Sequence, residues 1–118
     1  MLKIKKIDEQ ILDACVEETY TCGNYTILRR AFSNNRNYFS IRANEGASRF
    51  LPEIYHNYPS PFRNPDKESE RFKKGYFYIQ TIAYGGLELD EYGEFVKAVT
   101  HAQKVVEALN EYFIKEVK

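Results

Sequence analysis

The sequence predicts an α+β fold, in which an antiparallel sheet of about four strands packs against a long C-terminal helix. Residues 25–43 contain two strand-forming segments separated by a polar turn, which favours a β-hairpin. Residues 90–116 carry apolar side chains four and three positions apart, the spacing of one helix face. A chain of 118 residues has room for one hydrophobic core, so we expect a single domain over 1–118.

The N-terminal segment combines helical and strand patterns. Residues 7–20 place apolar side chains at helical spacing behind Asp8, a residue type that caps helices. Within this segment, 16–20 alternate like a strand. We therefore expect a short helix or turn that leads into a strand.

The middle of the chain holds two further candidate strands and a long connection. Residues 50–55 predict a short strand at a sheet edge, because Pro52 cannot donate to a strand ladder. Residues 57–75 are rich in proline and charge and predict a long loop, a kind of segment that often carries function. The aromatic and β-branched run 76–84 predicts a strand, which we expect at the centre of the sheet.

The helix predicted over 90–116 begins with acidic residues, which suit the positive end of a helix dipole. Its apolar face is broader than one small sheet is expected to cover, so we predict a homodimer formed partly through this helix. The residues expected at the dimer interface are Phe95, Val99, Val106, Leu109 and Phe113.

Charge, length of apolar runs and cysteine spacing exclude several classes of protein. Seventeen basic and seventeen acidic residues give no net charge, which argues against a histone-like binder. No apolar run approaches the length of a membrane helix, and the N-terminus lacks the apolar core of a secretory signal. Six residues separate Cys15 from Cys22, which fits neither a redox motif nor a zinc site. We expect a soluble, cytoplasmic protein with reduced thiols and no membrane partner.

The titratable residues do not form a catalytic pattern. The two histidines, His56 and His101, lack ligand-like neighbours at helical spacing, and Gly85-Gly86 lacks the lysine of a phosphate-binding loop. Acidic residues near the start of a helix ordinarily serve the helix dipole. We therefore expect a non-enzymatic protein with no catalytic residues, no metal and no cofactor.

The charges are unevenly distributed along the chain. Residues 23–49 carry five arginines and one glutamate, net +4, whereas 76–118 carry four lysines and seven acids, net −3. Arginine binds phosphate and stacks on rings, and cationic side chains interleaved with aromatic ones line grooves for single-stranded nucleic acid. The residues expected to form such a surface are Arg29, Arg30, Arg42, Tyr38, Tyr76 and Tyr78. An electrostatic match between the basic hairpin and the acidic helix would explain the same pattern.

The order of elements resembles that of the whirly-type and transcriptional-coactivator-type single-stranded-DNA-binding proteins. The matching stretches are 25–43 and 76–79, the latter followed by 86–92 at the start of the helix, and they cover about half of the chain. The loop 57–75 is an insertion relative to that pattern, and no motif matches residue for residue. The resemblance implies a curved sheet whose surface binds single strands, with dimers formed partly through the helix.

Two functions are therefore expected. The first is non-catalytic binding of single-stranded DNA or RNA through an arginine and tyrosine sheet face. The alternative is a protein interaction or accessory module that acts by self-association and through the 57–75 loop.

Overall fold

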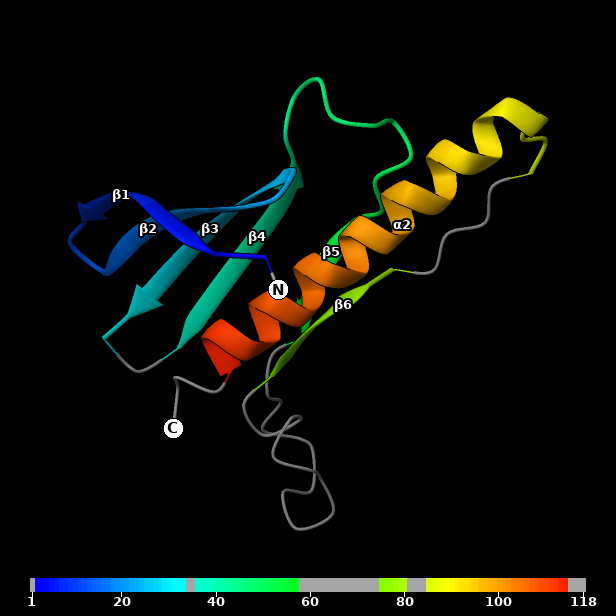
Figure 1. The fold of residues 1–118 in the computed structure, drawn as a ribbon. Coiled ribbons are helices and arrows are strands. Elements are labelled where there is room, and N and C mark those ends of the chain that lie inside the picture. The colour runs from blue at the N-terminus through cyan, green and yellow to red at the C-terminus, as the bar shows by residue number, and fades with distance from the viewer. Residues whose placement is uncertain (1, 34–35, 58–74, 81–84, 115–118) are drawn as a thin grey trace, which may run out of the picture.

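The computed structural model describes residues 2–33, 36–57, 75–80 and 85–114 (Figure 1). A four-stranded antiparallel sheet runs in sequence order β1-β2-β3-β4, so each strand pairs with the next one along the chain. A long C-terminal helix, α2, packs against it, which confirms the predicted α+β fold. The four strands are β1 (Lys5–Ile11), β2 (Cys15–Cys22), β3 (Tyr25–Phe32) and β4 (Asn37–Ala43).

The remaining elements are a second, smaller sheet and the helix. The strands β5 (Ile54–Asn57) and β6 (Tyr76–Ile79) pair antiparallel in this two-stranded sheet. The helix α2 spans Leu89–Leu109 and continues as a π-helical segment, η2 (Asn110–Ile114). The predicted helix thus begins within one residue of its expected start, and residues 115–118 lie outside the described residues.

The hairpin predicted over 25–43 is confirmed. The strands β3 and β4 pair antiparallel, with Ile27 opposite Ile41 and Arg30 opposite Tyr38. Side chains alternate between the two faces of a strand, so odd-numbered residues of this hairpin face the helix and even-numbered ones face away. Ile27 is fully buried, whereas Tyr38 is exposed.

The short helix considered for 7–20 is not present, because this segment forms the β1–β2 hairpin. The alternative, a turn that leads into a strand, is present between Ile11 and Cys15, where the Leu12 N–H donates to the Cys15 carbonyl at 2.9 Å. Alternate residues of β2 are buried, which is the strand pattern seen in 16–20. The apolar residues of β1 that have helical spacing are not buried. Ile7 lies at the β-bulge and is half-exposed, and Ile11 is 82% exposed. Pairing with β2 supplies the backbone of β1 with hydrogen bonds and outweighs its helical spacing.

The strand predicted over 76–84 is present at Tyr76–Ile79 and is not central in the main sheet. Its described part, β6, pairs with β5 in the small sheet, and residues 81–84 lie outside the described residues. The strand expected at 50–55 is displaced to β5, beyond Pro52, which cannot donate a ladder hydrogen bond. Most of the predicted 57–75 loop also lies outside the described residues.

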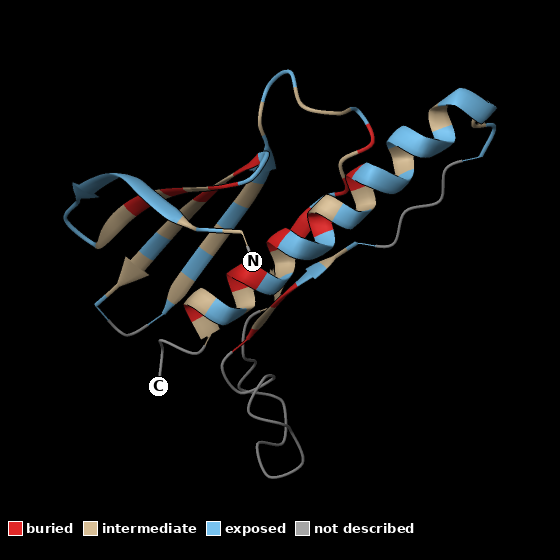
Figure 2. Ribbon diagram, in the orientation of Figure 1, coloured by how far each residue is buried: buried red, intermediate tan, exposed pale blue. Residues whose placement is uncertain are grey.

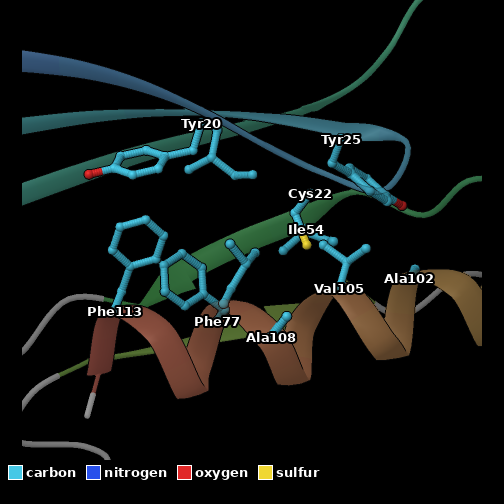
Figure 3. Close-up of a cluster of buried hydrophobic side chains, with 11 residues drawn as sticks. Tyr20, Cys22, Tyr25, Ile54, Phe77, Ala102, Val105, Ala108 and Phe113 are labelled. Atoms are coloured by element: carbon cyan, nitrogen blue, oxygen red, sulfur yellow. The ribbon is translucent and has the colours of Figure 1, made fainter. Parts of the chain in front are cut away.

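The core lies where the C-terminal half of α2 crosses the inner face of the four-stranded sheet (Figure 3). Val105, Leu109 and Phe113 from the helix pack against this face, and each is almost completely buried. The side-chain amide of Asn110 accepts a hydrogen bond from the backbone N–H of Phe77 at 2.8 Å and donates one to its carbonyl at 3.1 Å. This pair of bonds attaches β6 to the end of the helix.

A second joint connects the middle of α2 to the turn between β2 and β3. The backbone N–H of Asn24 donates to His101 Nε2 at 3.0 Å, and the imidazole stacks on the buried ring of Tyr25. Gly23 has a φ of +56°, and a Cβ there would lie 2.4 Å from the His101 ring. The Tyr25 hydroxyl donates to the Pro52 carbonyl at 2.6 Å. His101 is therefore a packing residue that anchors the helix to the sheet.

Candidate nucleic-acid interface

The outer face of β3 and β4 presents arginine and aromatic side chains together. Arg30 lies directly opposite Tyr38 in the ladder, and Arg42 lies on the same face four residues farther along β4. The ring of Phe32 meets that of Tyr38 edge to face, with centroids 5.3 Å apart. A shallow depression on this face is lined by Arg30, Phe32, Arg36 and Tyr38, and Arg42 lies beyond it along β4. We call the set Arg30, Phe32, Arg36, Tyr38 and Arg42 the arginine–aromatic surface.

Two guanidinium groups of this surface are directed to solvent. The side chain of Arg30 is 53% exposed, and its Nε donates to Glu17 Oε2 at 3.1 Å. This bond orients the side chain and leaves its two terminal nitrogens without a partner among the described residues. Arg42 is exposed and forms no ion pair within the described part of the chain. Both groups can donate two parallel hydrogen bonds to a phosphate.

Arg29 lies on the opposite, inner face of the sheet and does not belong to this surface. Its Nη1 donates to Glu18 Oε1 at 3.1 Å, and its Nε donates to Asn37 Oδ1 at 3.0 Å. The guanidinium also lies 5.8 Å from the centre of the Phe113 ring, at the end of the helix. Its donors are engaged within the fold, so Arg29 holds the sheet and the helix together.

Glu18 is the acid at the centre of this inner cluster. Burial raises the pKa of its carboxyl group. Hydrogen bonds from Lys6 and Tyr20 and the charge of Arg29 lower this pKa by more than burial raises it, so the net shift is downward. Lys6 Nζ lies 2.8 Å from Glu18 Oε2. The carboxylate therefore stays ionised and ties β1 to β3 through β2.

Tyr76 and Tyr78 lie in β6, in the separate two-stranded sheet, and the structure does not bring them beside Tyr38. Their rings lie 5.7 Å apart, and Tyr78 also packs against Tyr55, whose ring centroid is 6.0 Å away. Of the six residues expected to bind nucleic acid, the structure groups three on one face: Arg30, Tyr38 and Arg42.

Two residues of the surface were not predicted from the sequence. Phe32 shares strand parity with Arg30, so the alternation of β3 could have placed it on the same face. Arg36 follows the polar turn, and its position beside Phe32 depends on the way in which the turn closes.

The residues expected at a dimer interface are all at least partly buried within the chain itself. Leu109 and Phe113 are buried in the core of the chain itself, and Phe95 packs its ring against that of Phe50. Val99 and Val106 are partly buried. Figure 2 shows that the N-terminal half of α2 is largely exposed. Its exposed apolar residues are Leu89, Tyr92 and Val96.

The remaining reactive groups are placed for packing. Burial raises the pKa of the Cys22 thiol, which keeps it protonated, and lowers the pKa of His56 to about 4. The His56 ring packs between those of Phe39 and Phe77, with centroids 4.6 and 4.7 Å away. Within the described ranges, no group of three or more His, Cys, Asp or Glu residues is arranged to hold a metal ion. No helix in this part of the chain is both long and apolar enough to cross a membrane.

Comparison of the chain with protein-family models, with curated proteins and with solved structures finds no match.

Proposed function

We propose that this protein binds single-stranded DNA or RNA, without catalysis, on the outer face of β3 and β4. The observation that supports the proposal is the arginine–aromatic surface, where Arg30 lies beside the Phe32–Tyr38 ring pair and Arg42 lies farther along β4 on the same sheet face. Guanidinium groups neutralise phosphates, and aromatic rings stack on bases, which contributes about 1–3 kcal/mol per base. The contact to rings tolerates any base, so binding is expected to have little sequence preference.

Arg42→Ala is expected to weaken binding of a labelled single-stranded oligonucleotide about tenfold. Loss of one phosphate contact also lowers the slope of log affinity against log salt by about 0.7. Fluorescence anisotropy at about 50 and 200 mM salt measures both quantities, because phosphate contacts respond strongly over this range.

Arg49→Ala provides the matched control for this experiment. It removes the same charge, but Arg49 pairs with Glu91 and lies over the Phe50 ring, away from the surface. Its affinity and salt slope should remain those of the unmodified protein. Equal effects of the two substitutions would show that Arg42 makes no specific contact, and no binding at 50 mM salt would refute the proposed function.

A second candidate function is protein–protein interaction through the exposed half of α2. The partner is either a second copy of the chain, which gives a homodimer, or another protein. Leu89, Tyr92 and Val96 are spaced three and four residues apart and form one exposed apolar stripe. An exposed apolar stripe of this kind is typical of a surface that binds another protein. The 57–75 loop, which the alternative hypothesis also invokes, falls mostly outside the described residues.

Val96→Asp is expected to shift a concentration-dependent oligomer to the monomer in sedimentation velocity runs. A charge in the stripe must lose water to enter an apolar contact, which disfavours association. Gln103→Asp is the control, because Gln103 is exposed and polar on the same helix. A charge at Leu109 would test folding instead, since that side chain is buried within the chain. A protein that stays monomeric at high concentration would contradict self-association.

A further inference from the structure

We infer that the bound single strand runs along β4, with a base at the Phe32–Tyr38 end and a phosphate at Arg42, and that the site holds about three nucleotides. This inference rests on the proposed function and specifies its geometry. It depends on the rows of side chains that the register of the sheet places on the outer face.

The outer face of the β3–β4 hairpin has three rows. The first pairs Arg30 with Tyr38, beside the Phe32 ring, and the last pairs Thr26 with Arg42. Between them Leu28 lies opposite Ser40, a partly buried apolar side chain beside an exposed hydroxyl. The two guanidinium groups are thus attached at opposite ends of one continuous strip.

The length of this strip sets the number of nucleotides. Tyr38 and Arg42 are four residues apart on one strand, which corresponds to about 14 Å at the usual rise of a β-strand. Nucleotides follow one another about every 3.4 Å along a strand of the stacked duplex, and an extended strand has a larger spacing, so only a few nucleotides span this length. One base therefore contacts the ring pair, the next lies over the Leu28 row, and the third nucleotide reaches Arg42.

The charges of the neighbouring strands direct the path along β4 rather than across the sheet. On the outer face, Glu17 of β2 lies directly opposite Arg30 of β3, and Asp8 lies on the same face of β1. A phosphate displaced onto β2 or β1 would approach these carboxylates, with Lys5 as the nearest compensating base on that face. Repulsion between like charges therefore confines the backbone to the β3–β4 strip.

The length of the strip is tested by titrating the full chain with unlabelled thymidine oligonucleotides of two to eight nucleotides in competition with a labelled twelve-nucleotide strand. Affinity is expected to rise steeply up to about three or four nucleotides and then only slightly. The slight further rise is expected because a longer oligonucleotide can place any of several short stretches in the site. A steep rise that continues to eight nucleotides would overturn the short path along β4.

The base-binding end is tested with Phe32→Leu, which keeps an apolar side chain but removes the ring. We expect about a tenfold loss of affinity with an unchanged salt slope, because no phosphate contact is removed. Tyr78→Leu is the control, since Tyr78 lies in the other sheet and should bind normally. Circular dichroism of both variants checks that each is folded.

The outcomes separate this inference from the proposed function. If the twelve-nucleotide strand binds and Phe32→Leu behaves like the unmodified protein, the path along β4 is wrong while single-strand binding stands. A loss on Tyr78→Leu equal to that on Phe32→Leu would likewise overturn the path. If the labelled strand does not bind at 50 mM salt, the proposed function itself fails.

Discussion

Phe77→Ala is expected to lower the free energy of unfolding by about 3–5 kcal/mol, a large share of the stability of a small domain. The Phe77 ring is fully buried, and it packs edge-on against Phe39 at 4.9 Å and near Phe113 at 5.9 Å. Truncation removes these contacts and leaves a cavity between the small sheet, the hairpin and the end of the helix. Urea unfolding followed by circular dichroism measures the change.

Tyr78→Ala is the control for this prediction, because it truncates the next residue of the same strand. Tyr78 is 39% exposed, so its loss is expected to cost less than about 1 kcal/mol. Similar costs for the two substitutions would mean that β6 does not join the core through Phe77.

Acidification from pH 7 to pH 4 is expected to remove about 3 kcal/mol of stability through His56. Burial lowers the pKa of its imidazole from 6.5 to about 4. Below pH 6.5 the unfolded chain takes up a proton at His56 while the folded chain does not, so stability falls as the pH falls. Well below pH 4 both states are protonated, and this group contributes no further loss.

The contribution of His56 is isolated by comparing the protein with His56→Leu at each pH. Carboxylates such as Glu18 titrate in both proteins, so their contribution cancels in the difference. Relative to the variant, the unmodified protein should lose stability between pH 6.5 and 4, as measured by urea unfolding at fixed ionic strength. A difference that stays constant across this range would show that His56 is not held neutral by burial.

Local patterns predicted the elements whose partners are close in sequence. The hairpin over 25–43 follows from the alternation of its residues and a polar turn, and both strands pair within that segment. The helix follows from its apolar spacing and its acidic start, where the Glu91 carboxylate accepts a hydrogen bond from the backbone N–H of Glu88. The same alternation places Tyr38 and Arg42 on one face.

Only part of the candidate site could be predicted from the sequence. The face on which a strand residue lies is a local property, whereas the sheet to which a strand belongs is not. Arg29 and Arg30 are adjacent, so they must face opposite sides of the sheet, and only Arg30 reaches the outer face. The segment that contains Tyr76 and Tyr78 has a clear strand pattern, but nothing in this segment indicates that its pairing partner is β5. Their removal from the candidate site results from that long-range pairing.

Local sequence patterns were sufficient to predict the class of the fold, the hairpin and the helix, and they showed the concentration of arginine in 23–49. Contacts between distant segments set which strands join which sheet: β1 and β2 enter the main sheet, whereas β6 does not. They also place Leu109 and Phe113 in the core of the chain itself. The physical reason is that periodicity reports which face of an element is buried, whereas the partner that buries it depends on contacts between segments far apart in the chain.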